Sequence, residues 1–158
     1  MVNEQSPDVT GQPVPGKRIM ALDLGEKRIG VALSDETHLI ARSYTVLKRA
    51  SRRADFAQLA AIVAENDVGF LVVGLPVKLS GEEGPIAAWV RDYTAALAKQ
   101  LGIDYALWDE SFTTQQASES MRQRGTRAKE QRGWVDAVAA AFILQDFLDA
   151  RRDRASLP

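Results

Sequence analysis

The amino-acid sequence predicts a single α/β domain built on a mixed five-stranded sheet, with helices on both faces of the sheet. Two observations predict this fold class. Three strand-like segments follow one another in the first third of the chain, which indicates an antiparallel meander, and two later apolar strands alternate with helical segments. Strands separated by helices are joined by crossover connections and lie parallel, so the complete sheet is mixed. The 158 residues suffice for one domain with a substantial core, and the sequence shows no internal repeat.

The first part of the chain combines a polar leader with the three strands of the meander. Residues 1–16 are polar and contain several prolines and glycines, so we expect a disordered leader. Residues 17–23 and 28–34 are strand-like segments on either side of a glycine-containing turn, a pattern that is typical of a hairpin. Residues 40–47 supply the third strand.

The remaining strands alternate with amphipathic helices. Residues 53–65 place their apolar side chains on one helical face. Residues 69–74 (Gly-Phe-Leu-Val-Val-Gly) are a short apolar run without alternation, as expected for a central strand covered on both faces. Pro85 suits the first turn of the next helix, where apolar residues recur at helical spacing. Residues 103–108 then form the fifth strand.

Two helices complete the expected order of elements. Residues 113–122 begin with a Thr-x-x-Gln capping box, which favours a helix start. Residues 123–133 are rich in glycine and charge and form the expected linker to a long final helix over 134–151. Residues 152–158 are expected to be a flexible tail.

The end of the first strand carries the most informative residue. Asp23 closes an almost wholly apolar strand, although aspartate has poor strand propensity and is costly to bury without a partner. Gly25 and Gly30 bracket a turn that holds two cations, Lys27 and Arg28, close to this carboxylate. A strand-end acid, a glycine turn and adjacent bases indicate a site for metal ions and phosphate.

Three acids are candidates for catalysis. Asp23 and Glu110 each follow or end a predicted strand, and Asp136 lies in the last helix among apolar neighbours. Sites in open α/β sheets form beyond the carboxyl ends of strands, and carboxylates suit hard cations such as Mg²⁺ or Mn²⁺. Two such ions can activate water and stabilise the leaving oxygen in phosphodiester hydrolysis. A strand-end acid can also be a cap or turn former, and Asp136 could pair with Arg132 one helical turn earlier.

Several residues are candidates for binding a phosphate backbone. Lys27 and Arg28 could contact the scissile phosphate or be solvated turn residues, and Gly74 could admit a phosphate or only form a turn. A basic cluster with a net charge of +4, including Glu130, precedes Asp136; we interpret it as a backbone-binding arm made of Arg122, Arg124, Arg127, Lys129 and Arg132. A second basic cluster, formed by Lys48, Arg49, Arg52 and Arg53, fits a binding surface and a solvated face equally well.

Four motifs connect these residues to a known family. They are residues 23–35 (Asp-Leu-Gly-Glu-Lys-Arg-Ile-Gly-Val-Ala-Leu-Ser-Asp), 73–76 (Val-Gly-Leu-Pro), 109–114 (Asp-Glu-Ser-Phe-Thr-Thr) and 135–140 (Val-Asp-Ala-Val-Ala-Ala). With them, the chain resembles the YqgF/RuvX family of bacterial RNase H-like nucleases over nearly all of 18–148. Ser111 stands where this family usually has arginine.

The resemblance implies both a fold and an activity. It implies an RNase H-like nuclease domain over 17–151, with Asp23, Glu110 and Asp136 as the metal-binding acids. It also implies a role in maturing the 5′ end of small-subunit (16S) ribosomal RNA or in resolving Holliday junctions. The departure at Ser111 puts in doubt a phosphate contact by that side chain, but not the three acids.

The expected function is therefore metal-dependent cleavage of structured nucleic acid, with RNA favoured and branched DNA as the alternative. One alternative is a non-catalytic module that only binds nucleic acid, but such a module would gain nothing from carboxylates that face phosphate. Another is an actin-like ATPase, but those proteins resemble a duplication of this fold, and this chain has the length for one copy. The chain has no cysteine, which excludes thiolate sites, and its net charge of −1 assigns nucleic-acid affinity to local patches. The sequence carries no secretory or membrane segment, so we expect a cytoplasmic protein; a homodimer stays open.

Overall fold

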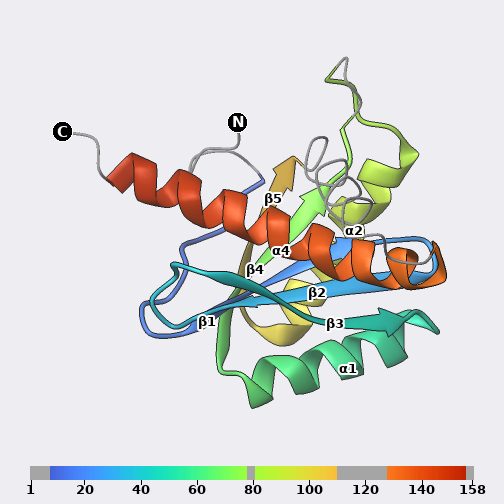
Figure 1. Cartoon of the computed structure of the whole chain (residues 1–158), viewed down its shortest axis with the longest axis horizontal. Helices are drawn as coiled ribbons and strands as arrows, with labels where there is room; N and C mark the ends of the chain where they lie inside the picture. Colours follow the sequence, from blue (N-terminus) through green and yellow to red (C-terminus); the bar gives the residue numbers. More distant parts are fainter. Residues whose placement is uncertain (1–7, 78–80, 110–127, 156–158) are drawn as a thin grey trace.

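The computed structural model describes residues 8–77, 81–109 and 128–155, with the backbone alone at 128–135 and 154–155. The elements along the chain are β1 (Arg18–Leu24), β2 (Arg28–Ser34), β3 (Ala41–Lys48), α1 (Arg52–Glu65), β4 (Val68–Leu75), α2 (Pro85–Leu101), β5 (Asp104–Asp109) and α4 (Ala128–Ala155) (Figure 1). The five strands form one sheet in the order β3-β2-β1-β4-β5. β1, β2 and β3 pair antiparallel, whereas β4 and β5 run parallel to β1. The predicted mixed sheet is confirmed.

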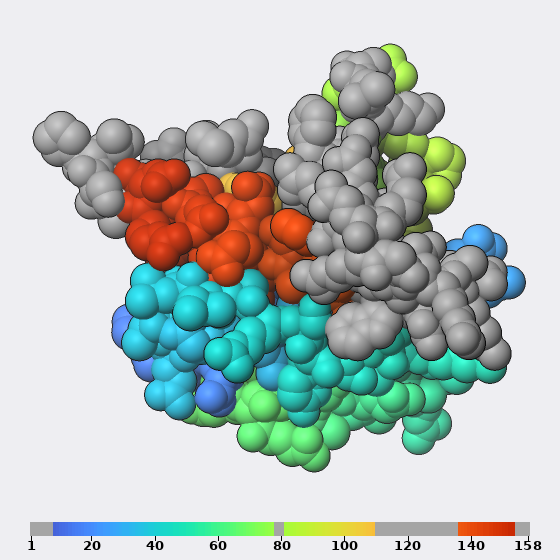
Figure 2. All heavy atoms as spheres, in the orientation of Figure 1, coloured from blue at the N-terminus to red at the C-terminus, as the bar shows by residue number. Residues whose placement is uncertain are grey.

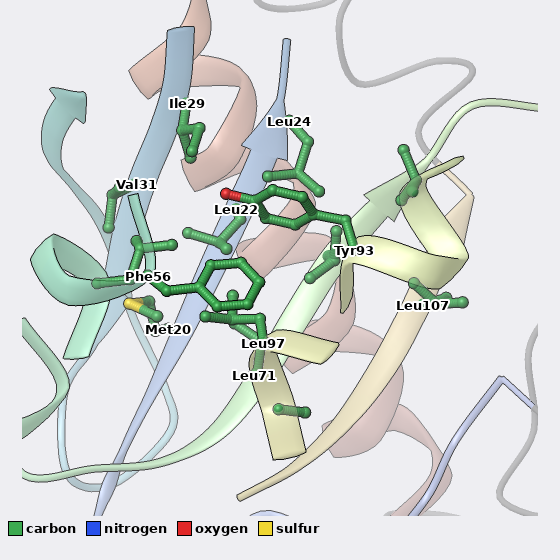
Figure 3. Packing of buried hydrophobic residues seen from close by; sticks show 14 of the residues in the cluster. Met20, Leu22, Leu24, Ile29, Val31, Phe56, Leu71, Tyr93, Leu97 and Leu107 are labelled. Atoms are coloured by element: carbon green, nitrogen blue, oxygen red, sulfur yellow. The ribbon is translucent and has the colours of Figure 1, made fainter. Parts of the chain in front are cut away.

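Each face of the sheet packs against helices, because successive side chains of a strand point to opposite faces. Met20 and Leu22 of β1 lie in a core that contains Phe56 of α1 and Tyr93 of α2, and Figure 3 shows the two rings packed over the strands. Ile19 and Ala21 of the same strand lie in a second core beneath α4. The sheet is therefore covered by α1 and α2 on one face and by α4 on the other.

The helix ends follow ordinary capping chemistry. Ser51 accepts a hydrogen bond from the Ala54 amide at the start of α1 (3.1 Å). Pro85 occupies the first turn of α2, as its sequence position predicts, and Gly102 closes that helix in the left-handed region with φ of 71°. None of the helices in the described ranges is long and apolar enough to cross a membrane.

The last helix is longer than expected. α4 begins at Ala128 and ends at Ala155, so it includes the second half of the expected linker 123–133 and the first half of the expected tail 152–158. Gly133 suggested a break, but one glycine costs a helix only about 1 kcal/mol relative to alanine, which packing of the rest of the helix can outweigh. The expected helix over 113–122 lies outside the described residues.

The expectation of a disordered leader is wrong for the part of it that the structure describes. Val9 forms an antiparallel bridge with Ala106, and the backbone of residues 8–10 exchanges hydrogen bonds with β5: Leu107 N–H donates to Asp8 O (2.8 Å) and Thr10 N–H to Tyr105 O (2.9 Å). Composition missed this contact because an edge strand offers unpaired backbone groups that even a polar segment can satisfy. Residues 1–7 lie outside the described part.

Candidate active site

Asp23 lies near the carboxyl end of β1, on the face that α4 covers. Ile19 and Ala21 point to this face, and alternation places Asp23 with them. Its cross-strand partner on β2 is Gly30, so the Asp23 side chain and the side-chain position of Gly30 share one face. Asp23 is partly buried, which keeps its carboxylate within reach of solvent.

Gly30 lets the Asp136 turn of α4 approach the strands. A Cβ at Gly30 would lie 1.9 Å from the Asp136 carbonyl oxygen and 3.1 Å from the Ala137 nitrogen. These separations leave no room for a side chain, so the close approach depends on glycine. Because Gly30 pairs with Asp23, the same approach brings Asp136 over the strand pair that carries Asp23. The fold therefore brings together two of the three predicted acids.

Arg28 is the partner of Asp136. Its Nε donates to Asp136 Oδ2 at 2.8 Å, and the two side chains are 38% and 21% exposed. Arg28 lies two residues before Gly30 on β2, which places it on the same face as Asp23. The sequence suggested Arg132 as a structural partner, and the side chain of Arg132 lies outside the described part of the chain. The ion pair that the structure describes joins positions 108 residues apart, beyond the reach of helical spacing.

The turn between β1 and β2 is tightly constrained. The Gly25 amide donates to Arg28 O (2.9 Å), and a Cβ at Gly25 would lie 2.8 Å from that same oxygen. Glycine is therefore required here for steric reasons. Lys27 is exposed at the outside of this turn, close in sequence to the Arg28–Asp136 pair.

The carboxyl ends of the parallel strands meet at the same edge of the sheet as Asp23. In the β1–β4 register Leu22 pairs with Val73, so Gly74 lies at the level of the next residue of β1, and Gly74 pairs with Trp108 of β5. Asp109 is the last residue of β5 and is exposed, and Glu110 follows it directly. β5 therefore ends at the same edge of the sheet as β1.

The other predicted site residues follow β5 along the chain. Glu110, Arg122, Arg124 and Arg127 lie outside the described residues, whereas the backbone of Lys129 and Arg132 belongs to α4. Within the described ranges no three His, Cys, Asp or Glu side chains form a group that could hold a metal. The described part of the candidate site contains two carboxylates, Asp23 and Asp136, and carboxylate oxygens are the kind of group that suits Mg²⁺ or Mn²⁺.

Sequence reasoning missed one residue that shapes the site. Arg49 was grouped with a basic cluster, yet its guanidinium lies against the β1–β2 turn, where Nη1 donates to the carbonyl oxygens of Gly25 and Glu26 at 3.0 Å each. No local pattern distinguishes Arg49 from its basic neighbours, because its partners come from a different part of the sheet.

Comparisons with known proteins identify the family of this chain. The RuvX family model, described as Holliday junction resolvase, matches residues 17–150. A relative from Anaeromyxobacter sp. (strain Fw109-5), named "Putative pre-16S rRNA nuclease", is 44% identical over 134 residues, which cover 85% of this chain and 98% of that protein. A relative of the same name from Myxococcus xanthus is 43% identical and covers 85% of this chain and 89% of its own.

A solved structure shows the same fold. T. thermophilus RuvC in complex with a Holliday junction substrate superposes with a TM-score of 0.55 and 17% identity, covering 87% of this chain and 96% of that one. The similarity supports an RNase H-like fold for this chain, as the sequence predicted. With a family model that matches most of its length and relatives above 40% identity, the chain belongs to the RuvX family of RNase H-like nucleases.

Proposed function

We propose that this chain is a divalent-metal-dependent nuclease that hydrolyses phosphodiester bonds near the 5′ end of the precursor of small-subunit ribosomal RNA. The observation that carries the proposal is the convergence of Asp23 and Asp136 on one face of the sheet, where Gly30 allows the close approach of α4. The names of the bacterial relatives support the choice of RNA. A reaction on ribosomal RNA would take place in the cytoplasm.

Asp23 and Asp136 would hold the metal together with Glu110, which directly follows β5. Carboxylates without cysteine form a hard, all-oxygen site, so Mg²⁺ or Mn²⁺ fits better than Zn²⁺. One or two such ions would supply an activated water and charge stabilisation at the leaving oxygen. The protein's own contribution is to hold the acids on rigid elements: Asp23 on a strand within the sheet, and Asp136 on a helix packed against it.

The cations of the β1–β2 turn would act on the substrate side of these acids. Arg28 fixes the direction of the Asp136 carboxylate through its Nε hydrogen bond, and the exposed Lys27 is free to meet a backbone phosphate. Gly74 would admit the nucleic-acid backbone at the strand edge. The basic arm of Arg122, Arg124, Arg127, Lys129 and Arg132 would contribute affinity through salt-dependent phosphate contacts.

Resolution of four-way DNA junctions is the second candidate, favoured by the description of the matching family model. RNA and DNA present the same phosphodiester, so three acids alone do not discriminate between them. The deciding experiment incubates the purified protein and Mn²⁺ or Mg²⁺ with a precursor-rRNA leader and, separately, with a four-way DNA junction. We expect specific cleavage of the leader, and faster cleavage of the junction would make resolution the main activity.

A variant separates catalysis from binding in the same experiment. Asp136→Asn should bind the preferred substrate and cleave it poorly. If the wild-type protein binds substrate but cuts neither nucleic acid with either metal, the chain is a binding module and the proposal fails. Light scattering on the same samples would establish whether the protein is a monomer or a homodimer.

A further inference from the structure

One arginine, Arg49, donates hydrogen bonds to the backbone carbonyl groups of the β1–β2 turn. Arg49 Nη1 donates to Gly25 O and to Glu26 O, each at 3.0 Å, and the Arg49 amide donates to Lys27 O at 2.9 Å. Three consecutive carbonyl groups of the turn therefore have the same residue as their partner. These contacts come directly after β3, whose register with β2 places Lys48 opposite Arg28.

Arg49 is itself held from two helices on the α1 and α2 face. Its Nε lies 3.7 Å from Asp55 Oδ2 of α1, and Asp55 is only 2% exposed. The other oxygen of that carboxylate, Oδ1, accepts a hydrogen bond from the Ala50 amide at 3.1 Å. The guanidinium carbon lies 4.5 Å from the ring centroid of Trp89 and 5.9 Å from that of Tyr93, both in α2. Charge, aromatic stacking and hydrogen bonds thus fix the guanidinium in one place.

We infer that Arg49 is a positioning residue of the active site, which sets the turn that carries Lys27 and Arg28 relative to Asp23 and Asp136. The inference rests on the proposed function, because it assumes that this turn borders the reacting phosphate. Arg49 acts through backbone carbonyl groups and needs no contact with substrate. Nη1 and Nε of Arg49 lie against partners within the protein, the turn and Asp55, which separates its role from that of a solvated or phosphate-binding residue.

Arg52 provides a matched control three residues further along. It also forms an ion pair with an aspartate, Asp92 (3.2 Å), and lies over aromatic rings, 5.9 Å from Phe56 and 5.1 Å from Tyr93. The structure gives it no hydrogen bond to the β1–β2 turn. Arg52 thus shares the charge and the aromatic surroundings of Arg49 but lacks its contacts with the site.

The experiment compares Arg49→Lys with Arg52→Lys in the full chain. Arginine uses Nη1 for the two carbonyl groups of the turn and Nε for Asp55, whereas lysine has a single nitrogen and cannot occupy both places. We expect Arg49→Lys to lower kcat by about 10- to 100-fold, since a displacement near 1 Å at a reacting centre can cost that much. Arg52→Lys should keep the wild-type kcat, and both variants should keep a cooperative melting transition.

A second measurement is independent of activity. Amide hydrogen exchange over residues 24–28 should be faster in Arg49→Lys than in Arg52→Lys or the wild type, because the turn has lost hydrogen bonds. Faster exchange with unchanged kcat would overturn the positioning role, as would equal loss of kcat in both variants. Unchanged exchange would overturn it as well. If the wild-type protein cleaves no substrate, the proposed function fails, and the exchange data alone then decide whether Arg49 orders the turn.

Discussion

Arg28 Nε and Asp136 Oδ2 lie 2.8 Å apart and join the start of β2 to the last helix. This ion pair neutralises the carboxylate of Asp136, whose turn of α4 lies over the strand pair that carries Asp23. In the proposed reaction, the guanidinium of Arg28 would also meet the incoming substrate phosphate. Arg28 would then link the geometry of the acids to the binding of substrate.

Neutralising either described acid should stop the reaction while the fold survives. Asp23→Asn and Asp136→Asn should each lower the rate of single-turnover cleavage by at least about 100-fold, because even residues that only orient metal ligands contribute 10- to 100-fold. Asp149→Asn, a change in the same helix at a residue that contacts Arg152 and Gln145, is the control and should cleave at the wild-type rate. A normal rate in Asp136→Asn would remove that residue from the catalytic set.

Removing Arg28 should strengthen the response to metal. In Arg28→Gln, Asp136 loses its neutralising partner, so a divalent cation should raise the melting temperature more than in the wild type. The same variant should bind nucleic acid more weakly, since it has lost a cation beside the site. Thermal melts across a Mg²⁺ titration measure the first effect, and an equal or smaller rise than in the wild type would show that Arg28 does not compete for the Asp136 carboxylate.

Gly30 is expected to tolerate no side chain without movement of α4. Gly30→Ala places a methyl group 1.9 Å from the Asp136 carbonyl oxygen, so α4 must shift; overpacking of this kind costs about 1–3 kcal/mol in unfolding free energy. Gly102→Ala is the control, because φ of 71° makes it strained while nothing lies within 4 Å of the new methyl group. We expect both variants to be less stable in urea, but only Gly30→Ala to lose cleavage activity. Full activity in Gly30→Ala would show that the site tolerates movement of the helix.

Asp35 should make stability depend on acid pH. Burial raises the pKa of this carboxyl, but hydrogen bonds from the Thr37 side chain and from the amides of Ile40, Leu39 and Thr37 outweigh that effect and hold the pKa well below its usual range. A carboxyl with a depressed folded-state pKa stabilises the protein above its unfolded pKa, about 3.9, and this stabilisation is lost as the pH falls below that value. Asp35→Asn should therefore melt lower than wild type at pH 7, and the gap should narrow below about pH 4. A gap that stays constant down to pH 3 would contradict the assignment.

The basic arm should govern affinity more than turnover. Neutralising Arg124 and Arg127 together should flatten the slope of log affinity against log salt concentration by roughly 1–2 units, one for each lost phosphate contact. Filter binding between 50 and 200 mM salt, roughly the range over which such contacts weaken, gives the slope. An identical slope in the double variant would identify the arm as a solvated face.

Local patterns predicted the elements well because most of them depend on neighbouring residues. The apolar run of β4 and Pro85 at the start of α2 are examples, and the mixed character of the sheet followed from the alternation of strands and helices after the meander. The sequence also predicted which end of the sheet would carry the candidate site, because Asp23 lies at the end of an almost wholly apolar strand. Membership of the family, which the comparisons confirm, was readable from four short motifs in order.

What the sequence could not predict depends on contacts between distant segments. The Arg28–Asp136 pair spans 108 positions, and Arg49 reaches the turn only because β3 returns alongside β2. The role of Gly30 was visible only as a turn signal, whereas its actual constraint is the backbone of α4 lying above it. In Figure 2 the orange-to-red atoms of α4 lie directly against the cyan atoms around the start of β3, where Ser43 donates to Ala137 O at 3.1 Å.

The pairing of residues 8–10 with β5 bears on whether this protein aggregates with other copies of itself. β5 ends the sheet on one side, and the short N-terminal segment occupies backbone groups that would otherwise be open to a strand from another molecule. Arg91 of α2 strengthens this cover through Asp8 and joins it to Glu83 at 2.8 Å. The family match begins at residue 17, so a polypeptide trimmed to that boundary would keep the proposed catalytic acids. It would expose the backbone groups of β5 that residues 8–10 cover, and we expect it to aggregate by pairing of strands between molecules.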